Sequence, residues 1–204
     1  MPTTTLPSAT RESILDSARA LLARLGYRKT AMEDVARDAG LSRRTIYLHF
    51  TDKADLFLAT IGKLVDGLLG RLEQELRGSG TPTQRLLAML ELRVLYRFDG
   101  VADHYKSLDE LMANLRPAYL ERREHWFEAE ARIFARAIEE GMRTGEFARG
   151  DASVLARTLV TATNALLPYS LSPRELGSRK DVERTVADLA ALLVRGLRNT
   201  ETRT

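Results

Sequence analysis

Apolar residues recur every three or four positions along most of the chain, and no segment shows the alternation of apolar and polar residues that is typical of a β-strand. The first such pattern runs from about residue 8 or 10 to Leu25, and Gly26 ends it. Later patterns predict helices over the ranges 52–77, 83–98, 103–114, 117–142, 151–168 and 180–197. The sequence therefore predicts an all-α fold, with three short helices at the N-terminal end and about six helices in a larger C-terminal bundle.

Two short helices are predicted after the first one from their end signals. Thr30 and Glu33 have the spacing of a capping box, in which the threonine accepts a hydrogen bond from the N3 amide and the glutamate reaches back. Gly40 is expected to end this helix in the left-handed conformation. Ser42 is then expected to cap a second short helix that begins at Arg43.

The second short helix has a narrow apolar face and a broad polar one. Because an α-helix has about 3.6 residues per turn, Ile46 and Phe50 share one side while Arg44 and Leu48 face away from it. Helix, glycine turn and helix over residues 31–50 is the helix-turn-helix pattern, whose second helix reads bases in the DNA major groove. An ordinary corner between two helices with solvated arginines has the same spacing, so the motif alone leaves both interpretations open.

Residues 11–57 as a whole closely resemble the N-terminal domain of the tetracycline-repressor (TetR) family of bacterial transcriptional regulators. The resemblance rests on the first helix, the Gly-Tyr pair after it, both helices of the motif, and the run Tyr-x-His-Phe-x-x-Lys that ends at Lys53. Two residues depart from the family pattern. Ala31 stands where a second Thr or Ser usually lies near a phosphate, and Arg44 stands where many members have Gly. These departures predict one phosphate contact fewer and one additional contact to a base or phosphate.

The resemblance implies a transcriptional regulator, most often a repressor, that binds a palindromic operator in double-stranded DNA as a homodimer. A small-molecule effector, expected here to be hydrophobic or aromatic, would release it. Arginines of the second motif helix are expected to read guanine edges, whereas His49 and Lys53 are expected to bind phosphates. The alternative is a helical small-molecule-binding or catalytic protein whose motif is a structural corner. The expected DNA-binding residues are Thr30, Arg43, Arg44, Thr45, Tyr47, Leu48, His49 and Lys53.

Aromatic, Met and polar residues of the C-terminal part are candidates for lining an effector pocket, although each is also compatible with an ordinary core or surface position. Tyr105 and Asn164 are the stronger candidates because they are polar residues on helices with apolar neighbours. The candidate ligand-binding residues are Met89, Tyr96, Tyr105, Met112, Trp126, Phe127 and Asn164.

The last two long helices carry apolar residues on two sides, which is more than one bundle face needs. They could form a deeply buried pair or a four-helix dimer seam with the same pair of a second subunit, and the family resemblance favours the seam. A dimer would place two modules about 34 Å apart, one turn of DNA. The expected seam residues are Leu155, Leu159, Ala162, Leu166, Val182, Val186, Leu189, Leu193 and Leu197.

Composition excludes several classes of function. The net charge is 31 − 28 = +3, so DNA affinity is expected from local placement of basic residues rather than from an overall field. The chain has no cysteine, which excludes disulfides and thiol chemistry within the chain. No apolar run approaches the roughly 18 residues of a membrane span, and the first ten residues lack the apolar core of a signal peptide. We therefore expect a cytoplasmic protein with no membrane association.

Four segments are expected: a disordered tail over 1–9, a DNA-binding domain over 10–57, a ligand-binding and dimerisation domain over 58–198, and a tail over 199–204. No phosphate loop, nucleophile elbow, zinc-protease motif or dinucleotide fingerprint is present, so no enzymatic activity, catalytic residue or cofactor is expected. Two distant histidines and one carboxylate match no metal-binding spacing, so no metal site is expected either.

Overall fold

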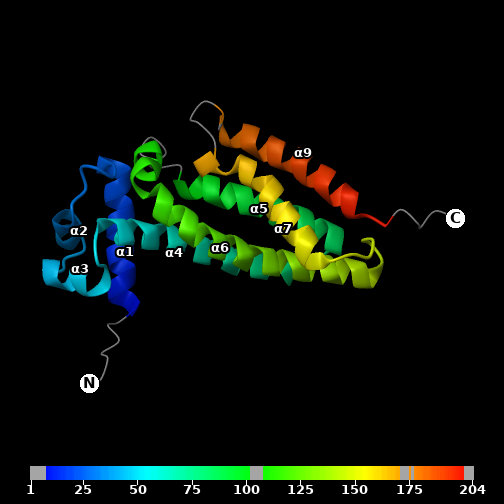
Figure 1. Ribbon diagram of the computed structural model, residues 1–204, viewed down its shortest axis with the longest axis horizontal. Coiled ribbons are helices and arrows are strands. Elements are labelled where there is room, and N and C mark those ends of the chain that lie inside the picture. The colour runs from blue at the N-terminus through cyan, green and yellow to red at the C-terminus, as the bar shows by residue number, and fades with distance from the viewer. Residues whose placement is uncertain (1–7, 102–107, 171–174, 176, 200–204) are drawn as a thin grey trace, which may run out of the picture. The chain divides into compact units, whose positions relative to one another are not determined.

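The computed structural model describes residues 8–101, 108–170, 175 and 177–199, and these ranges are almost entirely helical (Figure 1). The absence of named strands within them confirms the predicted all-α class. The helices are α1 (Ser8–Leu25), α2 (Met32–Asp38), α3 (Arg43–His49), α4 (Lys53–Leu76), α5 (Pro82–Val101), α6 (Leu108–Thr144), α7 (Ala152–Thr163) and α9 (Arg179–Leu197), with short 3₁₀ turns η2 (Asn164–Leu166) and η3 (Pro168–Ser170).

The chain divides into two compact units that do not follow a single cut in the sequence. One unit holds the described residues of Met1–Leu64 and Ala102–Leu120, and the other holds those of Val65–Val101 and Glu121–Thr204. The expected boundary at residue 57 therefore differs from this division. Two helices, α4 and α6, contribute residues to both units.

The N-terminal unit has a small core in which α1 packs on α2 and α2 packs on α3. Tyr27 belongs to this core, because its ring meets the edge of Phe57 at 5.2 Å between centroids. Packing on several elements at once is what holds helices this short in place, since an isolated seven-residue helix is unstable in water. The buried apolar residues include Ile14, Leu15, Ala18, Val35, Ala36, Ile46, Phe50, Leu56 and Phe57.

The C-terminal unit is built around α5, which packs along α9 and also touches α7. The inward stripe of α9, which includes Val182, Val186, Ala190 and Val194, repeats every four residues. A short β-bridge between Phe147 and Arg198 joins the segment after α6 to the end of α9. Gly141 of α6 makes room for this segment, because a Cβ atom there would lie 2.0 Å from Cδ2 of Phe147.

The predicted separate helices over 103–114 and 117–142 are wrong, because residues 108–144 form one helix that continues through Pro117. Residues 103–107 lie outside the described ranges. Proline inside a helix costs about 3 kcal/mol because it removes one hydrogen bond and crowds the preceding turn. Burial on both sides of Pro117 opposes that cost, since Leu111, Leu115 and Tyr119 are all buried.

The predicted helix 151–168 is shorter than expected. Asp151 caps it as predicted, accepting hydrogen bonds from the backbone N–H of Ser153 at 2.9 Å and of Val154 at 3.1 Å. The α-helix ends at Thr163, and η2 and η3 continue the chain.

Candidate functional site

Helix α3 is held by its cap and by two apolar contacts. Ser42 caps it as predicted, because its Oγ accepts a hydrogen bond from the backbone N–H of Thr45 at 3.1 Å. Gly40 has a φ of +66°, which permits the sharp turn from α2. Ile46 and Phe50 are buried on the inner side of α3. This short helix therefore has a fixed inner face and leaves its outer face to solvent.

The outer face of α3 carries basic, aromatic and apolar groups together. Arg43 and Arg44 are exposed, and Tyr47 and Leu48 are 42% and 60% exposed. The Arg43 guanidinium forms an ion pair with Glu33 at 2.9 Å and lies 5.4 Å from the Tyr47 ring centroid. Arg44 has no ion pair with any residue in the described ranges. One arginine is thus held in place by its neighbours, and the other is available to a partner.

Thr45 is half-buried, and its hydroxyl lies 2.8 Å from that of Ser42. Thr45 therefore contributes to the start of α3 as well as to the candidate surface.

The predicted role of Thr30 does not fit its position. Its side chain is buried, and its hydroxyl donates a hydrogen bond to the carbonyl oxygen of Gly26 at 2.8 Å. The predicted capping box is also displaced by one residue. Ala31 is the N-cap of α2, and Asp34 rather than Glu33 accepts the hydrogen bond from the N-cap backbone at 3.0 Å. Thr30 therefore closes the turn after α1, and its buried hydroxyl is not placed to contact DNA.

His49 and Lys53 lie beside the end of α3. His49 is half-buried, and its Nε2 has no hydrogen-bond partner within the described part of the chain. The Lys53 ammonium donates to the carbonyl oxygen of Arg28 at 3.3 Å and lies 4.3 Å from the Tyr27 ring centroid. Burial lowers the pKa of Lys53, and the nearby charge of Glu110 opposes that shift.

The candidate ligand-binding residues fall into different environments. Met89 is fully buried in the apolar core, where it is a packing residue. Tyr96 packs its hydroxyl against Gly67, where an added Cβ would lie 2.3 Å from it. Met112 belongs to the N-terminal unit, so it is not grouped with the others. Tyr105 lies outside the described residues.

Phe127, Trp126 and Asn164 are half-buried in the C-terminal unit. Phe127 and Asn164 both contact Arg93, which was not among the candidate ligand-binding residues. The Arg93 guanidinium lies 5.2 Å from the Phe127 ring centroid, and its Nη2 donates to Asn164 Oδ1 at 2.6 Å. The structure therefore brings together Phe127 and Asn164 through an arginine that sequence reasoning missed.

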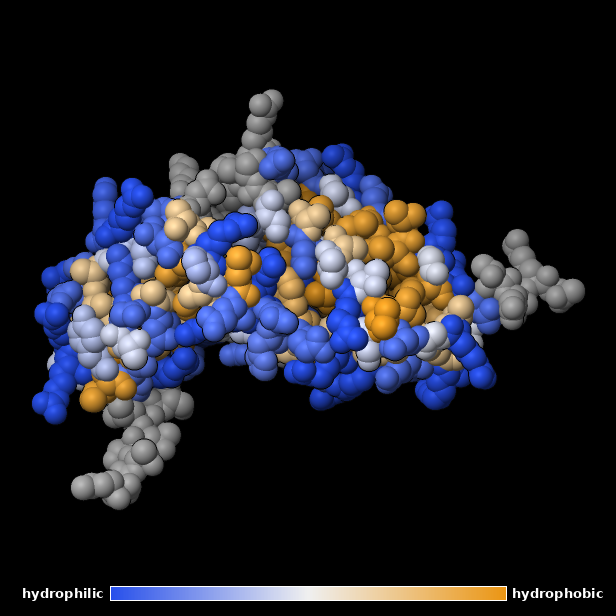
Figure 2. Space-filling view, in the orientation of Figure 1, coloured by the Kyte–Doolittle hydropathy of each residue, from blue (hydrophilic) through white to orange (hydrophobic). Residues whose placement is uncertain are grey.

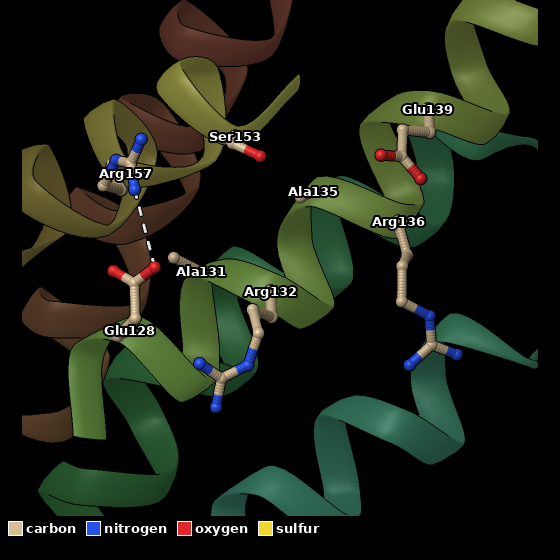
Figure 3. A pocket seen from close by; sticks show the side chains of 8 residues that line it. All are labelled: Glu128, Ala131, Arg132, Ala135, Arg136, Glu139, Ser153 and Arg157. Atoms are coloured by element: carbon tan, nitrogen blue, oxygen red, sulfur yellow. Dashed lines mark hydrogen bonds and ion pairs between the residues drawn. The ribbon is translucent and has the colours of Figure 1, made fainter. Parts of the chain in front are cut away.

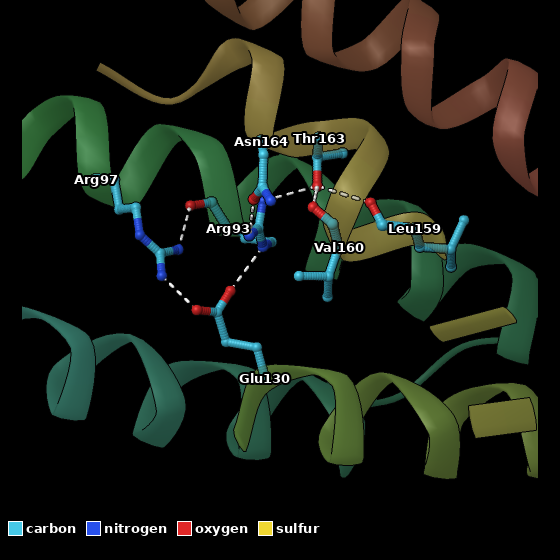
Figure 4. A network of polar contacts seen from close by, with 7 residues as sticks. All are labelled: Arg93, Arg97, Glu130, Leu159, Val160, Thr163 and Asn164. Atoms are coloured by element: carbon cyan, nitrogen blue, oxygen red, sulfur yellow. Dashed lines mark hydrogen bonds and ion pairs between the residues drawn. The ribbon is translucent and has the colours of Figure 1, made fainter. Parts of the chain in front are cut away.

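Arg93 is the centre of a buried polar network inside the helical bundle (Figure 4). Its Nε donates to Glu130 at 2.6 Å and its Nη1 to the Thr163 hydroxyl at 2.7 Å. Arg97 donates to the other oxygen of Glu130 and to the carbonyl oxygen of Arg93. Both guanidinium groups and the carboxylate are almost inaccessible to water. The signal in the sequence is a pair of arginines one turn apart on the apolar face of α5.

The charges of Arg97 and Glu130 in this network act on the Tyr169 hydroxyl. Removal of its hydroxyl from water raises the pKa of Tyr169, and the charge of Arg97 opposes the shift while that of Glu130 adds to it. The phenol is therefore neutral near pH 7.

A separate open groove of about 280 Å³ lies between α6 and α7 (Figure 3). Ala131 and Ala135 form its floor, and charged side chains surround it, including the ion pair of Arg157 with Glu128 at 3.5 Å. None of the candidate ligand-binding residues lines it. Its charged, open character does not suit a buried apolar effector.

The expected seam residues divide into two groups. Leu159, Val182, Val186 and Leu197 are buried within the chain, because they lie on the inward faces of α7 and α9, so the prediction that they face a second subunit does not fit. Leu155, Ala162, Leu166, Leu189 and Leu193 are half-buried.

Two apolar residues near the second group are more exposed and were missed by the sequence analysis: Val154 at 52% and Leu192 at 64%. Figure 2 shows apolar side chains gathered over α7 and α9 on the face toward the viewer. The sequence pattern did not separate the inward stripe from this outward one because both are apolar.

Metal sites and membrane-spanning helices were also looked for among the residues that the structure describes, and neither is supported there. Their His, Asp and Glu side chains form no group of three that could hold a metal ion. None of the helices there is both long and apolar enough to cross a membrane.

Comparison with known proteins finds matches that include the helix-turn-helix. Residues 14–60 match the family model described as bacterial regulatory proteins of the tetR family. The chain is 25% identical over 153 residues to the fatty acid metabolism regulator protein of Bacillus subtilis, covering 74% of this chain and 77% of that protein. It is 28% identical over 151 residues to the HTH-type transcriptional repressor KstR2 of Rhodococcus jostii, covering 72% of each.

Likeness to solved structures extends over nearly the whole chain. The crystal structure of a transcriptional regulator of the TetR/AcrR family from Thermobifida fusca superposes with a TM-score of 0.68 and 26% identity. It covers 94% of this chain and 100% of that one. The similarity therefore includes the helical bundle as well as the helix-turn-helix.

Proposed function

We propose that this chain, whose residues 14–60 match the tetR family of bacterial regulatory proteins, is a transcriptional regulator of that family and a repressor that binds a palindromic operator as a homodimer. We further propose that a small, hydrophobic or aromatic effector releases it from DNA. The observation that carries the proposal is the outer face of α3, which presents Arg43, Arg44, Tyr47 and Leu48 from a buried anchor.

The chemistry of that face suits a DNA major groove. An arginine can donate two hydrogen bonds to O6 and N7 of guanine, and an exposed leucine can meet a thymine methyl group. Arg44 is the stronger candidate for a base contact, because Arg43 is already paired with Glu33 at 2.9 Å. His49 and Lys53 are proposed to contact phosphates beside this helix, which would add affinity for any sequence.

A dimer is proposed because one such module makes too few contacts for tight, specific binding. The half-buried residues of α7 and α9, together with Val154 and Leu192, support a seam on the outward side of these helices. Figure 2 shows apolar side chains gathered over these helices, and a patch of exposed apolar surface commonly marks an interface. The four buried residues named above would support this seam from inside.

Control of DNA binding is proposed to act through the two helices that contribute to both units, α4 and α6. An effector that changes the geometry of the bundle would change the spacing of two recognition helices, which can engage successive major grooves only near one DNA turn. A decrease of about 100-fold in operator affinity requires about 2.7 kcal/mol of preference for the state that does not bind DNA. Burial of a few apolar groups of a ligand supplies free energy of that size.

Mobility-shift titrations with the DNA that flanks the protein's own gene test the proposal. The parent protein should bind one fragment far more tightly than scrambled DNA. Arg44→Ala should lose about 1–3 kcal/mol on the operator and relax the preference at one base pair. Lys53→Ala should weaken all sequences alike and reduce the salt slope by about 1. If the parent bound no flanking fragment above the scrambled background, the repressor would be ruled out.

A further inference from the structure

We propose that Glu110 of α6 limits the affinity of the N-terminal unit for DNA phosphates, because its carboxylate occupies the Arg28 guanidinium and its charge acts on Lys53. This inference rests on the proposed function and adds to it an internal anion that competes with DNA. The three residues all belong to the N-terminal unit, although Glu110 stands 82 residues after Arg28 in the sequence.

The first observation is a pair of contacts that joins Glu110 to Arg28. The Oε1 atom of Glu110 accepts a hydrogen bond from the backbone N–H of Arg28 at 3.2 Å. The same oxygen lies 3.4 Å from Nε of the Arg28 guanidinium. One carboxylate oxygen therefore holds both the backbone and the charged group of Arg28.

The second observation is the position of Lys53, which is proposed to bind a phosphate. Its ammonium lies 3.3 Å from the carbonyl oxygen of Arg28, so the two residues are neighbours. Burial lowers the pKa of Lys53, and the charge of Glu110 opposes that shift, so the field of the carboxylate reaches this ammonium. Two cations and one carboxylate are thus grouped around the backbone of Arg28.

The third observation is the difference in exposure between the two partners. The Arg28 side chain is 77% exposed, whereas that of Glu110 is 27% exposed. An ion pair with an exposed guanidinium is weak in water, and arginine binds phosphate through two parallel hydrogen bonds. The guanidinium can therefore leave Glu110 for DNA. Glu110 stays bonded to the Arg28 backbone, where its negative charge repels phosphates.

A role limited to support of the turn after α1 predicts the opposite effect on DNA binding. Loss of support would weaken binding, whereas loss of a competing charge makes it tighter. Glu110→Gln separates the two roles, because the amide oxygen of glutamine can still accept the Arg28 N–H while the negative charge is gone.

Anisotropy titrations with operator DNA and with scrambled DNA, at about 50 and about 200 mM salt, test the proposal. Glu110→Gln should bind both DNAs about 5-fold more tightly at the lower salt. The gain should shrink about threefold at the higher salt, because one further phosphate contact adds about 0.9 to the salt slope. Unchanged or weaker binding overturns the proposal, and so does a gain confined to the operator, since phosphates carry no sequence.

Asp16→Asn is the matched control, because it removes the same charge from the same unit. Asp16 pairs with Lys63 at 2.7 Å, and Glu12 would still pair with that lysine at 2.6 Å. The control should leave the affinity and the salt slope unchanged. An equal gain in both variants would mean that the net charge of the unit attracts DNA, which contradicts the proposal.

Arg28→Gln identifies the cation that is released. Alone, it should change the affinity for either DNA less than about twofold, because Glu110 already neutralises this guanidinium. Combined with Glu110→Gln, it should remove most of the gain. Persistence of the whole gain in the double variant would show that Glu110 does not act through Arg28, and the proposal would be wrong.

The two DNAs separate this proposal from the one on which it rests. If the parent preferred its operator and Glu110→Gln bound neither DNA more tightly, the repressor would stand and the competition by Glu110 would be wrong. If Glu110→Gln bound both DNAs more tightly but neither protein preferred the operator, the proposed function would be wrong and the competition would stand.

Discussion

Arginines are used in opposite ways in the two compact units. On α3 of the N-terminal unit, Arg43 and Arg44 are exposed, and at least Arg44 is available to another molecule. On α5 of the C-terminal unit, Arg93 and Arg97 are almost fully buried and are committed to Glu130. Arg43 and Arg44 are adjacent in the sequence, whereas Arg93 and Arg97 lie one helical turn apart, and the burial of each pair decides what its charges can do.

The difference has an energetic consequence. An exposed arginine can be removed at little cost to folding, because water solvates it in both folded and unfolded states. A buried pair depends on its partner, since removing one member leaves an ion in a poor solvent. Substitutions of the exposed arginines of α3 should therefore act on binding, and substitutions in the buried network should act on stability.

The largest expected effect is on folding stability in the C-terminal unit. Glu130→Gln removes the carboxylate that serves both Arg93 and Arg97, and it should lower the free energy of unfolding by about 3–5 kcal/mol. Chemical denaturation measures this. Glu128→Gln is the control, because its pair with Arg157 at 3.5 Å is exposed and should be worth less than about 1 kcal/mol. Similar small losses for both would contradict the comparison.

The next expected effect is on self-association. Leu192→Glu places a charge on the most exposed apolar residue of α9 and should weaken the proposed dimer at least about tenfold, because a carboxylate is costly to bury. Sedimentation equilibrium measures it. Ala191→Glu, at the neighbouring exposed position about 100° around the helix, should change association less. An unchanged dimer in Leu192→Glu would show that α9 is not the seam.

A smaller effect compares one cap in each unit. Ser42→Ala and Ser178→Ala each remove a side-chain acceptor at a helix start, and each should cost about 1 kcal/mol of stability. Only Ser42→Ala should also weaken operator binding, because it loosens the start of α3. Parallel melting and mobility-shift measurements test this. Loss of operator binding in both variants would mean that the caps act through overall stability.

The smallest effect is a dependence on pH. Hydrogen bonds from the Ser178 hydroxyl and backbone lower the pKa of Asp181 below its ordinary value of 3.8. A carboxylate with a lowered folded pKa contributes stability above its unfolded pKa, and that contribution is lost as the pH falls through the folded value. Thermal melting should therefore show parent and Asp181→Asn converging on acidification below about pH 4. A constant difference from pH 7 downward would contradict this role.

The sequence could predict the structural features that depend on local signals. The end of α2 at Gly40, the caps at Ser42 and Asp151, and the inner residues Ile46 and Phe50 depend on a few neighbouring residues. Each of these features is decided within one or two turns of helix, so pattern and spacing suffice to predict it.

Features that depend on contacts between residues far apart in the sequence were not predicted from the sequence. Thr30 has the right type and spacing for a cap, yet its hydroxyl bonds back to Gly26. Arg93 and Arg97 look like solvated arginines in the sequence, and only the approach of Glu130 from α6 makes their burial possible. The inward and outward apolar stripes of α9 differ only in what packs against them.

Pro117 gives α6 an uneven mechanical stiffness. A continuous helix resists bending because each turn is tied to the next by backbone hydrogen bonds, and proline removes one of these ties while leaving the chain path unbroken. The weakened turn spans residues 113–117, within the part of α6 that belongs to the N-terminal unit and one turn before α6 passes to the other unit after residue 120. A bending load on α6 would therefore be relieved at this turn, so that the rest of the helix transmits motion as a stiff rod.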